Sequence, residues 1–138
     1  MWEGMRQKLW LCALLVGAAV LTGCSLHAEE KKIRDVEYTV VCTEDLPEEL
    51  RQEIDKVKTE EFQLSYDDGA YLYLVKGYGT RDTSGFDITV SELYLTDHTL
   101  VFDTKINGPK EGEDVTQKET TPMIAVKTER IERQIVFR

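Results

Sequence analysis

The chain has 138 residues, of which 17 are Lys or Arg and 26 are Asp or Glu, so its formal net charge is −9. This length provides for one domain. An acidic surface repels nucleic acid and anionic lipid headgroups, which excludes a nucleic-acid-binding protein and a protein that adheres to membranes through basic patches.

The first 23 residues have the order of a secretory signal. Arg6 and Lys8 are basic, and residues 9–20 form an apolar run that is too short for a comfortable transmembrane helix. The sequence Leu-Thr-Gly-Cys then ends at Cys24 and matches the bacterial lipobox, in which cleavage precedes the cysteine and its thiol receives diacylglycerol. We predict a lipoprotein signal peptide over residues 1–23 and acylation of Cys24, with chains such as palmitate. An uncleaved anchor helix with an incidental cysteine is the alternative.

Acylation of Cys24 would supply a membrane anchor, because each buried CH₂ contributes about 0.8 kcal/mol and two chains hold a protein stably. Cleavage removes Arg6, Lys8 and Glu3, so 15 basic and 25 acidic residues remain and the net charge becomes −10. We expect a lipid-anchored protein on the extracytoplasmic face of the cell membrane. Residues 24–34 would be the lipidated cysteine and a polar tether, and residues 35–138 a single domain.

The domain is expected to begin with one strand. Val36, Tyr38, Val40 and Cys42 alternate with Glu37 and other residues, which is the period of a half-buried strand. This pattern predicts that Cys42 is buried and inert. As the single thiol left after cleavage and acylation, it has no partner for an internal disulfide.

An amphipathic helix of about three to four turns is expected next. Its apolar residues are spaced four, four and three apart, which places them on one helical face: Leu46, Leu50, Ile54 and Val57. Asp45 and Glu48 have the spacing of a capping box, and Pro47 suits the first turn. We expect this helix to pack on a sheet; a partner-binding helix is the alternative.

From residue 62 onward the pattern is that of β-structure. Asp67-Asp68-Gly69 and Asp97-His98 are typical hairpin turns, and the apolar phase slips near Ser91-Glu92, which predicts a β-bulge. Two further strands are expected at 121–127 and 134–138. The predicted fold class is α+β: six or seven mostly antiparallel strands, in a curled sheet or small sandwich, with one N-terminal amphipathic helix covering an opening.

The stretch Arg81-Asp-Thr-Ser-Gly resembles an active site at first sight. An aspartic protease, however, needs two carboxylates that share a proton, and the sequence has no second such motif. Ser84 would need a base, and the two histidines fall in the tether (His27) and in a predicted turn (His98). Neither the acidic turns nor the cysteines form a metal-ligand pattern. We therefore expect no enzyme activity, no cofactor and no metal.

The β region resembles the C-terminal domain of the PrcB-like family, which are accessory subunits of a bacterial protease complex. The resemblance covers about residues 70–138 and consists of four short elements: Thr83-Ser84-Gly85-Phe86, Gly108-Pro109, Val115-Thr116-Gln117 and Thr121-Pro122. Ser84 stands where a glycine is common, and Phe86 replaces a tyrosine. The resemblance implies a protein that binds and stabilises another exported protein, of which a protease is one candidate, and that does so through these four elements.

A second resemblance is to chagasin-like inhibitors of cysteine proteases. Their Thr-Thr-Gly-Phe/Tyr loop enters the target's cleft, and Thr83–Phe86 could take that place. Their Gly-x-Gly-Gly and Arg-Pro-Trp loops are absent from this sequence. A protease inhibitor that uses the Thr83–Phe86 loop is thus the alternative function.

Overall fold

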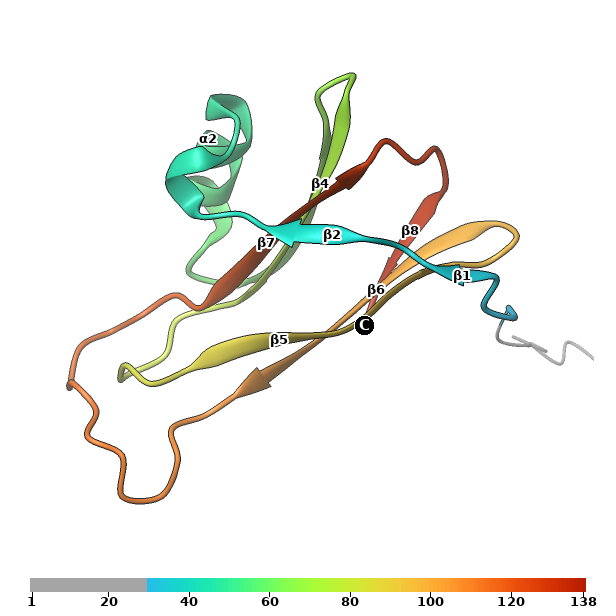
Figure 1. Cartoon of the computed structure of the whole chain (residues 1–138). Helices are drawn as coiled ribbons and strands as arrows, with labels where there is room; N and C mark the ends of the chain where they lie inside the picture. The colour runs from blue at the N-terminus through green and yellow to red at the C-terminus, as the bar shows by residue number, and fades with distance from the viewer. Residues whose placement is uncertain (1–29) are drawn as a thin grey trace, which may run out of the picture.

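The computed structural model describes residues 30–138, which form two sheets and one α-helix (Figure 1). The predicted signal peptide and Cys24 lie outside the described residues. Within the part that is described, no helix is long and apolar enough to cross a membrane. The elements are β1 (Arg34–Asp35), β2 (Tyr38–Val40), the 3₁₀ helix η1 (Thr43–Asp45), α2 (Glu48–Val57), β3 (Glu61–Asp67), β4 (Tyr71–Tyr78), β5 (Asp87–Leu95), β6 (Thr99–Asn107), β7 (Met123–Glu129) and β8 (Gln134–Phe137).

The strands form two four-stranded sheets that do not close into a barrel. We name them by their order: the first sheet is β1-β5-β6-β8 and the second is β2-β7-β4-β3. All pairings are antiparallel except β6 with β8. The chain passes repeatedly from one sheet to the other: β7, for example, joins the second sheet, and β8 then returns to the first sheet beside β6.

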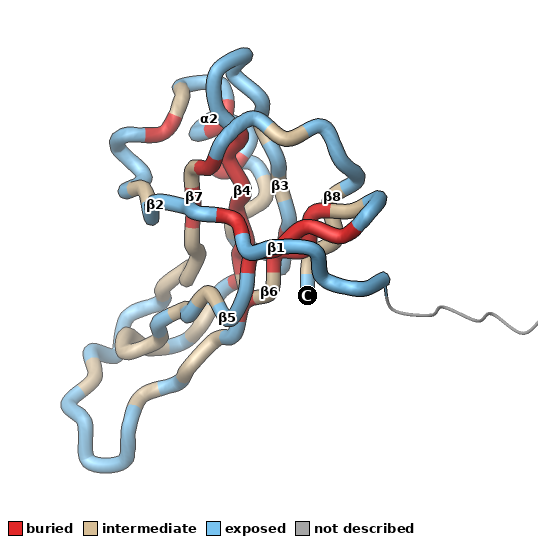
Figure 2. Tube along the Cα trace, turned by 45° about the vertical axis from the view of Figure 1, so that its right-hand side comes forward, coloured by how far each residue is buried: buried red, intermediate tan, exposed pale blue. Residues whose placement is uncertain are grey.

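The main core lies between the two sheets. Figure 2 shows the buried positions concentrated in the middle strands of each sheet. Leu74, Leu100, Phe102 and Val126 are completely buried there, and the ring of Phe102 meets that of Phe137 edge-on at 5.9 Å. The buried side chains of this core are Val36, Leu72, Leu74, Leu93, Leu95, Leu100, Phe102 and Val126. The predicted small sandwich therefore describes the arrangement, with open edges.

A second core lies on the other face of the second sheet, where α2 packs. The helix contributes Leu50 and Ile54, and Leu46 precedes it; all three are at most 4 % exposed. They contact Phe62, Tyr73, Val75 and Ala125 of the sheet. The apolar spacing thus correctly predicts the helix and its buried face. The helix covers the face of a sheet, however, and not an opening between sheets.

The segment from Arg34 to Val40 crosses from one sheet to the other, which the alternating pattern did not predict. β1 pairs with β5 and β2 pairs with β7, so the expected single strand is two short ones. Val36 lies in the core between the sheets, but Val40 is 60 % exposed and Cys42 is exposed. The prediction of a buried Cys42 is wrong, because the strand ends at Val40, at an open edge of the second sheet.

Three local features of the β region are confirmed. Asp68 lies in the β3–β4 turn, where its Oδ1 accepts hydrogen bonds from the backbone N–H groups of Ala70 (2.8 Å) and Tyr71 (2.6 Å). Residues 96–98 connect β5 and β6. The register between these two strands shifts between Val90 and Glu92, at the expected bulge.

Other details differ from expectation. There are eight strands within residues 30–138, and the last one pairs in parallel. The capping box does not form: the N-cap of α2 is Pro47, which has no side-chain bond to offer, and Asp45 belongs to η1. Strand pairing also begins within the predicted tether, where the Ile33 N–H donates to the Leu95 carbonyl at 2.7 Å.

Candidate protein-binding surface

Two long loops meet at one end of the molecule. Residues 79–86 connect β4 to β5, and residues 108–122 connect β6 to β7; we call them together the loop pair. Figure 1 shows the two loops side by side at the end opposite the β5–β6 turn. The register contributes to their position, because Gly77 pairs with Met123 and Asp87 with Asn107, so the two strands of each sheet that carry the loops end level with each other.

The backbones of the two loops are hydrogen-bonded to each other. Arg81 and Thr120 exchange both backbone bonds, at 2.8 and 2.9 Å. The Ser84 N–H donates to the Thr116 carbonyl at 3.0 Å. In return the Thr116 N–H donates to the Ser84 hydroxyl at 2.8 Å, and the Thr120 hydroxyl donates to the Thr83 carbonyl at 2.8 Å. The loops are therefore held as one unit.

Gly85 packs tightly against the longer loop. Its φ of +91° is in the range that favours glycine. A Cβ at this position would be 3.0 Å from side-chain atoms of both Pro109 and Val115. Beside it, the guanidinium of Arg81 lies over the ring of Phe86, with 5.6 Å between its carbon and the ring centroid. Gly85 is thus required both by its backbone conformation and by close packing.

All the residues of the four sequence elements lie in the loop pair. Those of the first element and Pro109, Val115, Thr121 and Pro122 are half-buried, because they pack within the loops or against the strand ends. Gly108, Thr116 and Gln117 are exposed. The structure therefore brings together the predicted partner-binding residues, although they are up to 39 positions apart in the sequence.

Sequence reasoning missed Arg81 and Thr120, which join the middle of the two loops. Thr120 lies beside an element that was recognised, but nothing in the sequence indicates that Arg81 would be its partner. The Arg81 Nε is buried and has no hydrogen-bond partner among the described residues, while its Nη2 donates to the Tyr78 carbonyl at 3.3 Å. An unsatisfied buried donor costs about 1–3 kcal/mol.

An open hollow of about 980 Å³ adjoins the loop pair. Its lining combines loop backbone with exposed charged side chains: Gly85, Phe86, Asp87, Asn107, Gly108, Lys110, Glu111, Gly112 and Glu113. Within it, the Lys110 N–H donates to the Glu113 carboxylate at 2.8 Å, and the Glu113 N–H donates to the Lys110 carbonyl at 3.0 Å. The tip of the longer loop is therefore a closed turn.

The loop pair does not assemble a nucleophile with a base. The Ser84 hydroxyl accepts the Thr116 N–H, and His98 lies in the β5–β6 turn, beyond the far end of the nine-residue β5. Among residues 30–138, no group of three or more His, Cys, Asp or Glu side chains is placed to hold a metal ion. The loop pair instead presents a polar surface whose two segments are held together by hydrogen bonds.

Charge near the loop pair is organised by Lys76 and Glu61. Lys76 is 5 % exposed and its Nζ donates to the Glu61 carboxylate at 2.6 Å. This hydrogen bond lowers the pKa of Glu61, and the charges of Lys76 and Arg81 lower it further. The buried ammonium of Lys76 is therefore paired with a carboxylate that is itself exposed to solvent.

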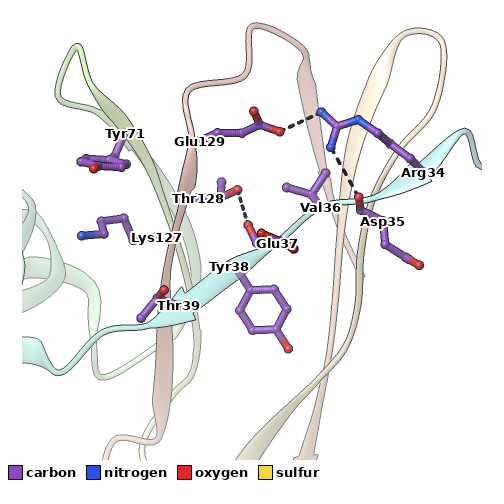
Figure 3. A pocket seen from close by; sticks show the side chains of 10 residues that line it. All are labelled: Arg34, Asp35, Val36, Glu37, Tyr38, Thr39, Tyr71, Lys127, Thr128 and Glu129. Carbon is purple, nitrogen blue, oxygen red and sulfur yellow. Dashed lines mark hydrogen bonds and ion pairs between the residues drawn. The ribbon is translucent and has the colours of Figure 1, made fainter.

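A second hollow, of about 810 Å³, follows the crossing segment (Figure 3). The Arg34 guanidinium reaches Glu129 at 2.7 Å, and the Thr128 hydroxyl donates to the Glu37 carbonyl at 2.8 Å. These contacts hold β1 and β2 against the end of β7. Tyr38 lies in the foreground of the figure and is 40 % exposed.

Comparison with family models shows where the known domain lies. Residues 72–129 match the model described as PrcB C-terminal. This region is similar to the PrcB C-terminal domain. It runs from the second residue of β4 to the last residue of β7 and so contains the whole loop pair, whereas β8 lies outside the match and the resemblance had been expected to reach residue 138. No curated protein and no solved structure matches the chain.

Proposed function

We propose that this chain is a non-catalytic lipoprotein, anchored through acylated Cys24 on the extracytoplasmic face of the membrane, whose loop pair binds and stabilises another exported protein. The observation that carries the proposal is the match of residues 72–129 to the PrcB C-terminal domain, a region in which both loops are joined by hydrogen bonds into one surface. A protease is one candidate for the partner.

The architecture of the loop pair suits protein binding. Because the loops are already fastened to each other, little conformational entropy remains to be lost when a partner binds. Thr116 and Gln117 expose their side chains while the Thr116 backbone holds the fold. The unsatisfied Arg81 Nε is a cost to stability at this end of the molecule, as is common where a surface serves function.

The inhibitor alternative is less well supported by this geometry. A loop that enters a cleft must project from its scaffold, whereas all of Thr83–Phe86 is half-buried against the longer loop. Gly85 in particular is covered by Pro109 and Val115. Most exposed residues of the loop pair, 110–114 and 116–119, belong instead to the longer loop, which favours a broad contact surface.

The test is capture of the partner from membranes by the tagged full-length lipoprotein after cross-linking. Gln117→Arg places a bulky charge on the exposed part of the loop pair, and Gln52→Arg is the matched control on the exposed side of α2. We expect Gln117→Arg to reduce capture about tenfold or more, equivalent to about 1.4 kcal/mol, and Gln52→Arg to leave it unchanged. Equal capture by both variants, or no specific partner, would refute the proposal.

A further inference from the structure

The first described residues are docked on the β5–β6 turn, far from the loop pair. The Glu30 carboxylate contacts the Thr96 hydroxyl and lies 2.8 Å from the His98 Nδ1. The Thr96 hydroxyl is in turn 2.6 Å from that of Thr99, so the cluster spans the whole turn. Glu30 is therefore held against the turn between β5 and β6.

Residues 32–34 continue this docking along both sheets. The Ile33 N–H donates to the Leu95 carbonyl at 2.7 Å. The Lys32 ammonium is 3.1 Å from the Glu92 carboxylate and lies over the Tyr94 ring at 5.4 Å. Arg34 then reaches Glu129 at the end of β7. Contacts to β5 and β7 together fix the direction in which the chain enters the domain.

The same end of the molecule gathers the other short turns. The Arg130 side chain in the β7–β8 connection donates to the Asp67 carboxylate at the β3–β4 turn, at 2.8 Å. β8 begins beside Thr99, at the β5–β6 turn. The loop pair is separated from these turns by the length of β5, whose nine residues span about 30 Å.

We propose that this docking points the loop pair away from the membrane, so that the partner is bound about 30 Å or more beyond the turns that face the bilayer. The inference rests on the proposed anchor at Cys24. Glu30 follows Cys24 by six positions, and six residues reach at most about 20 Å. That length cannot carry the chain past the domain, so the docked turn end must stay next to the bilayer.

The partner class follows from this orientation. A protein bound at the loop pair must itself extend from the bilayer, or be free of it, because a partner confined to the headgroup level cannot reach the loops. The net charge of −10 after cleavage also keeps the whole domain off the bilayer surface, since an acidic domain is repelled by anionic lipid. We therefore expect a partner with a substantial exported globular part.

The experiment measures the distance from the membrane of two points on the lipoprotein. Asp97→Cys marks the docked turn and Glu111→Cys marks the loop pair, each in a Cys42→Ser background so that the exposed native thiol does not react. The full-length protein is produced with its own signal, purified in acylated form, labelled with a donor dye and placed in phosphatidylcholine vesicles that carry acceptor dyes on their headgroups.

We expect energy transfer to place residue 111 about 30 Å farther from the headgroups than residue 97. A flexible insertion of about ten residues between Cys24 and Glu30 should shrink this difference, because a longer tether lets the domain rotate. Equal distances, or a closer residue 111, would overturn the orientation and leave the capture of a partner untouched. Absence of transfer from both labels would overturn the anchor and the orientation together.

Discussion

The two ends of this domain are built in different ways. At the docked end, the β3–β4 connection is a short turn that closes through its own side chain, with Asp68 bonding to Ala70 and Tyr71. At the other end, the loops are long, and each is held by the other through bonds such as Arg81 with Thr120. A turn of the first kind is encoded by its own few residues, whereas the loop pair exists only when two distant segments meet.

This comparison predicts that the loop pair is most sensitive where Gly85 packs against the longer loop. Gly85→Ala must adopt an unfavourable φ and push Pro109 and Val115 apart by a few tenths of an ångström. We expect a loss of about 2–4 kcal/mol in the free energy of unfolding, measured by urea titration.

Gly112→Ala is the matched control within the same loops. Gly112 also has a positive φ, but nothing lies within 4 Å of the added Cβ. It should cost only about 1–2 kcal/mol, from backbone strain alone. If the two alanine variants were equally stable, close packing between the loops would not be what holds them together.

Ser84→Ala separates a structural hydroxyl from a nucleophile. The substitution removes the acceptor of the Thr116 N–H in a half-buried position, so we expect a loss of about 1 kcal/mol. Ser65→Ala, at an exposed position of β3, is the control and should stay within about 0.5 kcal/mol of the parent. A Ser84→Ala variant as stable as the Ser65→Ala control would show that the hydroxyl does not join the loops.

The smallest effect is expected at the docked end, as a pH dependence. Hydrogen bonds from the N–H groups of Tyr71 and Ala70 hold the pKa of Asp68 below its ordinary value of 3.8. A lowered pKa in the folded state means that the contribution of Asp68 to stability is complete above pH 3.8 and is lost as the pH falls through the lower, folded-state value.

The melting temperature of the parent and of Asp68→Asn should be compared between neutral pH and pH 3. The parent should lose more stability than the variant over the acid part of this range. Parallel curves would mean that the carboxylate is not held by its turn, and the contrast between the two ends of the molecule would lose its clearest local example.

The sequence alone determined the features that depend on neighbouring residues. The spacing of Leu50 and Ile54 predicted the buried face of α2 correctly, because a helix repeats its faces every three to four residues. The Asp67–Gly69 and Asp97-His98 turns and the bulge near Ser91 were also correct, since turn chemistry and strand period act over a few residues.

The same reasoning failed in the segment from Val36 to Cys42. Alternation indicates that one side of a strand is apolar, but it cannot tell which sheet the strand joins or where that sheet ends. The chain crosses between sheets after Val36, so Val40 and Cys42 emerge at an open edge. The predicted capping box was wrong as well. Asp45 belongs to the 3₁₀ helix η1, and Pro47 is the N-cap of α2.

For the loop pair, too, some features follow from the sequence and others only from the tertiary structure. The sequence by itself determined its residue types and its resemblance to the PrcB-like family, whose C-terminal model matches residues 72–129. Only the tertiary structure decided that Ser84 meets Thr116 and that Arg81 meets Thr120, because those contacts require β4 to pair with β7 in one sheet and β5 with β6 in the other. Local patterns act over a few residues, and the meeting of the two loops depends on sheet register across the whole domain.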